Sequence, residues 1–240
     1  MVSPVSAVAA ILLAALASCS AATAPSARVQ VPQQAPPAHV QSTQLSNPPE
    51  YDFDAHGVAR VSLKQLGKSW HHGCPVPPRD LRALQVRFWG FDRSRHTGVV
   101  IVNRTALHAV RVAFRAIRHA HFPIRRVRPV AEYGASDNKS MAHDNTSAFN
   151  CRYAVANGPK SWSAHAYGSA VDIDPRENPY RLNGKILPPS GAKYADRSKH
   201  RRGMIFAGGP VVRAFDAVGW GWGGRWGSTP DYQHFSASGR

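Results

Sequence analysis

The chain has 240 residues, of which 43% are hydrophobic and 18% charged, and its formal net charge is +16 at pH 7. Such a basic balance is typical of proteins that bind polyanions, of which nucleic acid is the first to consider. The positive residues are scattered along the chain, however, and the densest clusters are Arg125–Arg128 and Lys199–Arg202. The sequence contains no Walker or dinucleotide-binding fingerprint and no internal repeat, which excludes the common nucleotide-binding folds and repeat architectures.

The first residues have the character of an export signal. Ala7–Ala17 is an apolar stretch of signal-peptide length that is too short to span a bilayer. It ends in Leu16–Cys19, which resembles a bacterial lipobox, so we expect residues 1–18 to be removed and the thiol of Cys19 to be lipidated. A plain secretory signal cleaved near Ala21 or Ala22 is the alternative. No other segment of the sequence is long and apolar enough to cross a membrane.

Residues 19–57 are rich in Pro, Ala, Gln and Ser and lack apolar periodicity. We therefore predict a lipid-anchored flexible tether that leads to one domain, residues 58–240, which is large enough for its own core. A random coil of about 35 residues has an r.m.s. span of roughly 30–35 Å. An exported chain meets anionic wall polymers and lipid headgroups. Our preferred interpretation of the basic residues is a solvated surface, and attraction to those polyanions is the second. We expect no nucleic-acid partner.

Removal or lipidation of Cys19 leaves two cysteines, Cys74 and Cys151. Because export places them in an oxidising compartment, we expect one disulfide between them. In the chain-entropy model, closing a loop of this length contributes on the order of 4 kcal/mol, less any strain. The alternative, in which both thiolates bind zinc, is disfavoured by the spacing and by the compartment.

The rest of the chain shows an α+β pattern, with helices packed on a mostly antiparallel sheet. Thr105–Ala120 predicts a helix, because its apolar residues line one face and Arg111, Arg115 and Arg118 lie towards the other. The other predicted elements, in chain order, are strands at 84–91, 98–103 and 124–130, a polar loop at 134–146, a basic loop over the site at 185–203, and a short helix at 211–218.

Two segments near the C-terminus carry metal-ligand residue types. The first contains His165 and Asp172 within the pattern S-x-H-x-x-G-x-A-x-D, and the second contains Asp231 and His234. Two neutral imidazoles and one carboxylate are a common ligand set for a catalytic zinc, and they leave a fourth position for water. Asp231, three residues before the second histidine, is the right kind of group to take a proton from that water.

The local sequence supports this grouping. Residues 170–174 alternate as a strand does, with Val171 and Ile173 on one face and Asp172 and Asp174 on the other. Gly168 allows a tight backbone turn between the histidine and this strand. In an extended strand Asp231 and its histidine would face opposite sides, so a turn is required there if both serve one metal, and Pro230 favours one.

These residues resemble the zinc D-alanyl-D-alanine carboxypeptidases, peptidase family M15, which include the vancomycin-resistance D,D-peptidases and some phage L-alanyl-D-glutamate endopeptidases. The similarity extends from about Gly73 to Phe235, and its flanking segments are similar to an actinobacterial, lipoprotein-like branch: Gly73–Val76, Thr146–Arg152, Asn178–Tyr180 and the Trp/Gly run before Asp231. The Gly-Tyr-Arg segment that carries the substrate-binding arginine in many members is missing, and Glu132–Asp137 stands near its place.

The resemblance implies a small hedgehog/D,D-peptidase-like fold with one zinc on His165, Asp172 and His234, and with Asp231 as general base and acid. It implies an exported, monomeric enzyme that hydrolyses peptidoglycan stem peptides, either a lipoprotein on the outer face of the cytoplasmic membrane or a protein secreted to the wall. D-alanyl-D-alanine carboxypeptidase activity is preferred. The alternatives are L-alanyl-D-glutamate endopeptidase, D,D-dipeptidase, and a wall-binding lipoprotein without catalysis.

A carboxypeptidase must recognise a free C-terminus, and the planar fork of arginine pairs with carboxylates through two hydrogen bonds. Our candidate is Arg152, with an added hydrogen bond from Ser163; the alternative is that Arg152 makes a structural ion pair. The run from Gly219 to Gly227 offers three indoles, which either pack against the sheet beside the site, as we prefer, or line a cleft.

Overall fold

The computed structural model describes residues 50–155 and 159–239. The expected signal peptide, Cys19 and most of the tether therefore lie outside the described residues. Within those residues, no helix has the length and the apolar character needed to span a membrane.

The first sheet is antiparallel and has the order β1 (Val58–Arg60), β2 (Leu81–Trp89) and β3 (Arg95–Asn103). β2 and β3 form a long hairpin, and its turn is held by the N–H of Gly90, which donates to the carbonyl of Ser94 at 2.8 Å. These strands are longer than the sequence predicts, because the first residues of each strand are partly polar yet still pair across the hairpin in full register.

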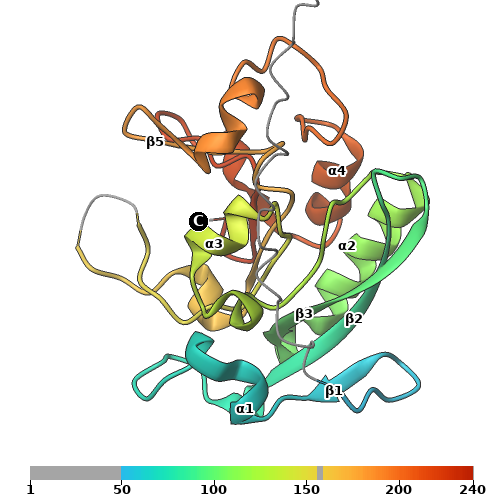
Figure 1. Cartoon of the computed structure of the whole chain (residues 1–240), viewed down its shortest axis with the longest axis vertical. Helices are drawn as coiled ribbons and strands as arrows, with labels where there is room; N and C mark the ends of the chain where they lie inside the picture. The colour runs from blue at the N-terminus through green and yellow to red at the C-terminus, as the bar shows by residue number, and fades with distance from the viewer. Residues whose placement is uncertain (1–49, 156–158, 240) are drawn as a thin grey trace, which may run out of the picture. The chain divides into compact units, whose positions relative to one another are not determined.

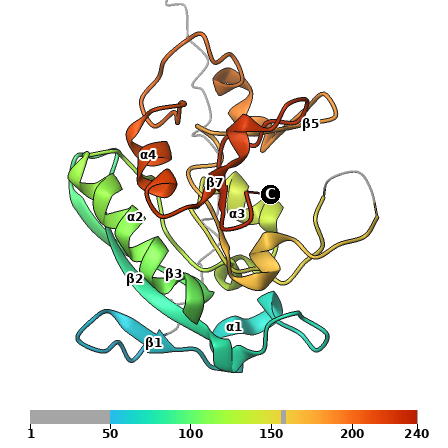
Figure 2. The ribbon, with the colours of Figure 1, turned by 180° about the vertical axis from the view of Figure 1, so that it is seen from behind.

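Helix α2 (Leu107–His119) runs alongside β2 and β3 (Figures 1 and 2). Its buried face consists of Val110, Ala113, Phe114 and Ile117, which repeat at helical spacing and pack against apolar residues of β2 and β3. Helix α4 (Pro210–Asp216) contributes to the same core. Both helices were predicted, and the structure confirms them with ends shifted by one to two residues.

The second sheet is also antiparallel, with the order β4 (Ala170–Asp172), β8 (His234–Ser236) and β7 (Gly221–Trp222). The register pairs Asp172 with His234 across β4 and β8. The inner residues Val171 and Phe235 are fully buried in the main core. Two of the predicted ligands are therefore neighbours on a short sheet whose other side chains anchor it.

The remaining elements are short. They comprise the hairpin β5 (Tyr180–Leu182) and β6 (Lys185–Leu187), the helices α1 (Leu63–Leu66) and α3 (Asp137–Ala142), and 3-10 segments at Gly67–Ser69, Pro78–Asp80, Arg104–Ala106, Val130–Tyr133, Ala164–Tyr167, Pro189–Tyr194 and Gly223–Arg225. With small antiparallel sheets and a few helices, the chain has the predicted α+β class.

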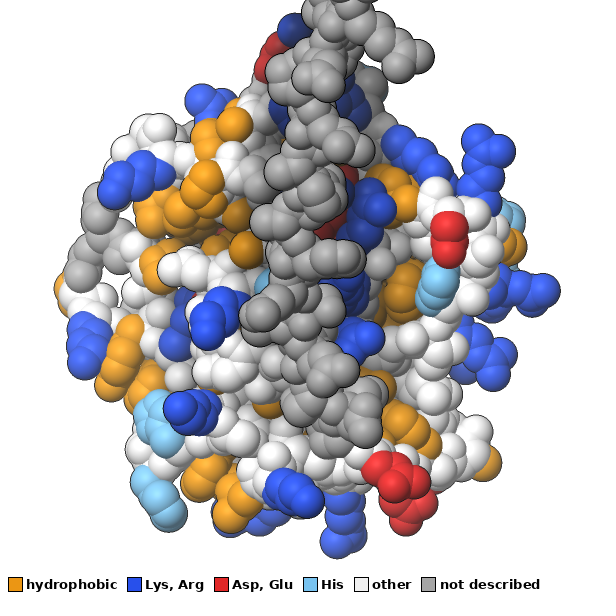
Figure 3. Space-filling model, viewed as in Figure 1, with side chains coloured by type: hydrophobic (Ala, Val, Ile, Leu, Met, Phe, Trp, Pro, Cys, Tyr) orange, Lys and Arg blue, Asp and Glu red, His pale blue; other side chains and the backbone are white. Residues whose placement is uncertain are grey.

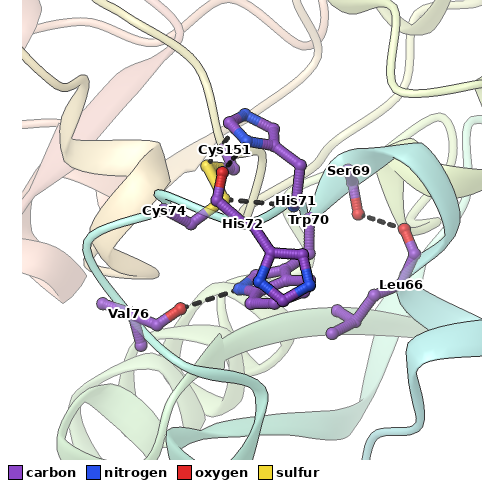
Figure 4. The surroundings of a disulfide bond; sticks show 8 residues. All are labelled: Leu66, Ser69, Trp70, His71, His72, Cys74, Val76 and Cys151. Carbon is purple, nitrogen blue, oxygen red and sulfur yellow. Dashed lines mark hydrogen bonds between the residues drawn. A yellow bond between two sulfur atoms is a disulfide. The ribbon is translucent and has the colours of Figure 1, made fainter.

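A disulfide joins Cys74 to Cys151 (Figure 4). The N–H of Cys151 donates to the carbonyl of Ser69, and the indole of Trp70 donates to the carbonyl of Val76. The pairing expected from the sequence is present. It links the start of the domain to Arg152, the residue that follows the second cysteine.

Three element predictions were wrong. Residues 124–130 form no strand. The N–H of Ile124 donates to the carbonyl of Trp89 at the end of β2, but the next N–H, that of Arg125, donates to the carboxylate of Asp174, so only isolated bridges form. The loop at 134–146 contains α3, whose first turn is capped by Ser136. The loop at 185–203 begins with β6, which pairs with β5, and continues into a 3-10 segment.

The predicted alternation through Asp174 was also wrong. β4 ends at Asp172, and Asp174 adopts a left-handed backbone with φ of 42°. Its N–H donates to the hydroxyl of Thr146, and its carboxylate accepts from the N–H of Arg125. The two aspartates therefore serve different parts of the molecule.

Candidate metal centre

Three predicted ligands converge. His165 Nε2 lies 3.1 Å from Asp172 Oδ2, and His234 Nδ1 lies 3.0 Å from Asp172 Oδ1. The two imidazole nitrogens are 3.2 Å apart. All three residues are more than half buried, and the histidines are almost completely so. These atoms all lie within 4.8 Å of one another, close enough for one ion to bridge them.

The backbone around His165 presents its ring to this point. His165 lies in the 3-10 segment Ala164–Tyr167, whose first turn is capped by the hydroxyl of Ser163, which accepts from the N–H of His165. Gly168 ends the segment in a left-handed conformation with φ of 66°. A Cβ at Gly168 would lie 2.5 Å from the backbone nitrogen of Asn103, so both the turn and the close approach require glycine.

The chemistry of the donor set fits a metal ion. His165 Nδ1 lies 2.6 Å from the carbonyl oxygen of Ala148 and must carry the proton there, because a carbonyl only accepts. The lone pair of Nε2 is therefore free to face the other two ligands, as in metal-bound histidines whose second nitrogen is fixed by a backbone carbonyl. Burial alone would raise the pKa of Asp172, but His165 and His234 outweigh it and hold that pKa well below its ordinary value.

Asp231 lies beside the three ligands. Its N–H donates to the carbonyl of Gly223, and its own carbonyl accepts from the N–H of His234 at 3.3 Å, which closes the turn that the sequence required. Burial, together with repulsion from Asp172, raises the pKa of Asp231 to about 7. A carboxyl group with this pKa exchanges its proton near neutral pH, as a general base or acid must.

Among the buried polar atoms that have no hydrogen-bond partner within the described residues, two belong to the predicted metal ligands and the predicted general base. They are Oδ1 of Asp231 and Nε2 of His234, and both are buried. Buried polar atoms are usually paired, so each such exception requires an explanation. Both residues line one cavity of about 670 Å³ together with the other ligands, so a molecule bound in the cavity could satisfy them.

Arg152 lines the same cavity. Burial lowers its pKa, and the nearby charges of Asp172 and Asp231 oppose that shift, which places the guanidinium in the field of the candidate centre. It also forms an ion pair with Asp137, whose carboxylate accepts from Asn150 at 2.7 Å. Arg152 thus has both the structural partner considered as an alternative and a position facing the cavity.

Sequence reasoning assigned no site role to several residues of the cavity, among them Asp137 and Tyr180. Ser136 directly before Asp137 is a typical start signal for a helix and could have predicted α3. Tyr180 could not be found, because the single bridge that brings it to Asp231 joins residues far apart in the sequence.

The tryptophan run divides between two roles. Trp220 and Trp222 are buried in the main core, and the indole of Trp222 donates to the carbonyl of Tyr232, so packing is the correct account of both. The ring centroid of Trp226 lies 5.3 Å from that of His234, and Trp226 lines the cavity. One of the three indoles therefore borders the candidate centre.

A second group of metal-ligand types, His71, Cys74 and Cys151, lies away from this centre. Both sulfur atoms are consumed by the disulfide, and His71 Nε2 lies 3.5 Å from the sulfur of Cys151 (Figure 4). Thiolate ligands therefore do not form in this structure, as the spacing and the compartment indicated.

A comparison with known protein families gives a match to the segment that carries the candidate centre. Residues 156–237 match the family described as D-alanyl-D-alanine carboxypeptidase. The matched segment contains His165, Asp172, Asp231 and His234, and it begins after the disulfide cysteines and Arg152. Neither the curated proteins nor the solved structures contain a match to the chain.

Proposed function

We propose, on the premise that residues 156–237 belong to the D-alanyl-D-alanine carboxypeptidase family, that this protein is a zinc-dependent peptidase of peptidoglycan stem peptides. The observation that carries the proposal is the convergence of two imidazole nitrogens and one carboxylate beside a second, buried carboxylate. The family supports a peptidase that acts on the cell wall, while the metal and the bond that is cleaved are parts of the proposal.

The proposed ligands are His165 Nε2, His234 Nδ1 and the carboxylate of Asp172. When bound, a zinc ion would supply a Lewis acid that polarises the scissile carbonyl and acidifies the attacking water. Asp231 accepts a proton from that water at its carboxylate and then donates it to the leaving amine. The carbonyl of Ala148 keeps the proton of His165 on Nδ1 and so fixes the orientation of the ring.

The substrate carboxylate would bind Arg152 in the same cavity. The ion pair with Asp137 positions one edge of the guanidinium, and an arginine has further N–H groups for a second partner. The hydroxyl of Ser163 accepts from the N–H of His165, and its own proton could be donated to substrate. A free C-terminal carboxylate as the recognised group favours carboxypeptidase over endopeptidase activity.

Asp231 also argues against the alternative of a wall-binding protein without catalysis. A carboxylate kept for structure would be expected to have its oxygens paired, whereas Oδ1 is buried without a partner among the described residues. Burial and the charge of Asp172 destabilise the charged form of Asp231, and this raises its pKa. A binding protein gains nothing from such a group.

The test is product analysis with purified protein and a muramyl pentapeptide that ends in D-Ala-D-Ala. We expect release of a single terminal alanine, which a mass spectrum identifies. Cleavage after the first alanine of the stem would instead identify an endopeptidase, and hydrolysis of free D-Ala-D-Ala alone a dipeptidase. Zinc-loaded protein that cleaves none of these would overturn the proposed function.

The proposed location is the outer face of the cytoplasmic membrane, with a lipid on Cys19. The support is the lipobox-like Leu16–Cys19 and a family that acts on the wall. Cys19→Ala should move the protein from the membrane fraction to the medium, and a high-salt wash separates this effect from electrostatic attachment. Wild-type protein that washes off in salt would be a secreted, unanchored enzyme.

A further inference from the structure

A second cavity of about 550 Å³ lies between α2, β2 and the turn that precedes β1. It shares no residue with the metal cavity. Its charged lining consists of Arg87 from β2 and of Arg111, Arg115 and Arg118 from α2, with His56 and His119 beside them. The three helical arginines are four and three residues apart, which places them on one face of α2.

The charge of this cavity is weakly compensated. The ion pairs that arginines make within residues 50–155 and 159–239 involve Arg104, Arg125, Arg128, Arg152, Arg176 and Arg225, and none of the four arginines of the cavity. Asp54 is the nearby carboxylate, and its charge interacts with that of Arg111. Its oxygen Oδ1 already accepts from the N–H groups of His56 and Val58.

Arg111 adds a specific signal. Its Nε is buried and has no hydrogen-bond partner among the described residues. Guanidinium N–H groups form strong bonds to phosphate and carboxylate oxygens, and a buried N–H without a partner costs free energy. Lysine and arginine side chains are spread over the face of the molecule that Figure 3 shows, so the total charge alone would not single out a site. A concave group of four arginines, none of which forms an ion pair within the described residues, does single out a site.

We propose that this cavity binds the phosphate groups of a phosphodiester-linked anionic polymer of the bacterial wall. The choice of a wall polymer rests on the proposed function, whereas the cationic cavity does not. A flexible chain can enter a concave site and reach all four arginines, whereas the flat surface of a lipid bilayer would meet mainly the two exposed ones, Arg87 and Arg115. Among Phe, Tyr and Trp, the residues with the large rings on which single-stranded nucleic acids stack their bases, the lining contains Phe114, which is 2% exposed and therefore not available for stacking.

The test measures binding of the full chain to poly(glycerol phosphate) over a range of salt concentrations. If each arginine neutralises one phosphate, the single-strand value of about −0.7 per contact gives a slope of log affinity against log salt of about −2.8. Affinity should then fall roughly 50-fold between 50 and 200 mM salt. The double variant Arg87→Gln/Arg115→Gln should reduce the slope to about −1.4. The affinity of this variant should then fall only roughly 7-fold over the same salt range.

Arg79→Gln/Arg93→Gln is the matched control, because it removes the same charge from two exposed arginines outside the cavity. It should keep the wild-type slope. Equal losses in both double variants would show diffuse charge and overturn the proposal. So would wild-type protein that binds phosphatidylglycerol vesicles or single-stranded DNA but not the polymer. Circular dichroism verifies that each variant is folded.

Binding is measured without hydrolysis, and Asp231→Asn protein should give the wild-type curve. A protein that binds the polymer but cleaves no stem peptide would refute the proposed function and keep this site. An active peptidase whose polymer binding does not depend on the cavity would refute this site and keep the proposed function.

Discussion

At the scale of single residues, the buried carboxylate of Asp231 distinguishes a catalytic centre from a metal-binding one. Asp231→Asn keeps the size of the side chain but removes its ability to take a proton. We expect the variant to retain zinc and to lose at least ~100-fold in turnover, the usual size of a general acid–base contribution. Metal content and turnover on the muramyl pentapeptide are measured on the same sample. Loss of zinc with little other change would make Asp231 a ligand.

Arg152 is tested by changing the shape of its cation. Arg152→Lys keeps the charge but loses the planar fork. A hydrogen bond to a charged group contributes about 1.5–3 kcal/mol, so kcat/KM for a peptide with a free C-terminus should fall roughly 10- to 100-fold. The amidated peptide should lose much less.

Asp137→Asn is the control for that experiment, because it weakens the ion pair while leaving the guanidinium in place. It should impair the peptide with the free C-terminus more than the amidated one, but less than Arg152→Lys does, because the planar fork is still present. If Arg152→Lys impairs both peptides equally, the arginine is structural and the substrate carboxylate binds elsewhere.

The residues of the candidate centre could be predicted because their spacing is local. Within the first segment, one turn and one short strand separate His165 from Asp172. Within the second, a single turn separates Asp231 from His234. The partner of Arg152 could not be predicted, because Asp137 belongs to a different element and reaches it only in three dimensions.

At the scale of elements, the exit of β4 is held by a cluster of buried carboxylates. Asp174 accepts from the backbone of Arg125, and Asp144 accepts from the backbone of Arg176 at 3.0 Å. The guanidinium of Arg176 bridges Asp144 and Glu177. These contacts fasten the segment after Asp172 to two distant loops and so fix the strand that carries this ligand.

The cluster predicts a pH dependence of stability. Burial, together with the proximity of Glu177, raises the pKa of Asp144 from 3.8 to about 7, although Arg176 opposes the shift. The folded state therefore binds this proton more tightly than the unfolded state does. The corresponding stabilisation is complete below the unfolded pKa near 4 and is lost as pH rises through about 7. The groups that face Asp144 are Arg125, Arg176, Asp174 and Glu177.

Asp144→Asn should therefore flatten the loss of stability between pH 5 and pH 8, whatever it does to the stability at one pH. The free energy of unfolding is measured with denaturant at both pH values and at fixed metal content. The exposed variant Asp52→Asn should keep the wild-type dependence. An unchanged pH dependence in Asp144→Asn would show that this carboxyl does not bind the proton.

The sequence predicted elements well where periodicity governs them and poorly where side chains replace backbone partners. The apolar face of α2 and the alternation of β2 determine both elements locally. Residues 124–130 have strand-like composition, but the carboxylate of Asp174 takes the N–H of Arg125, and no local pattern reveals that.

At the scale of the whole molecule, the predicted α+β class is confirmed, and two antiparallel sheets share one core with α2 and α4. The arrangement that matters for function is the register of β4 and β8, which joins Asp172 to a histidine 62 residues later. Hydrophobic pattern alone does not fix such a long-range pairing, and the sequence indicated it only through the ligand types at both ends. The arginine stripe of α2 was also visible, but Arg87 joins it only through the fold.

The central claim is that His165, Asp172 and His234 hold one zinc on which hydrolysis depends. The most direct measurement combines metal analysis with activity on the muramyl pentapeptide, before chelation, after chelation and after zinc is returned. We predict one zinc per chain, loss of hydrolysis on chelation and recovery with one equivalent of zinc, whereas His165→Ala and His234→Ala should neither bind zinc tightly nor recover. Full hydrolysis by metal-free protein would contradict the account.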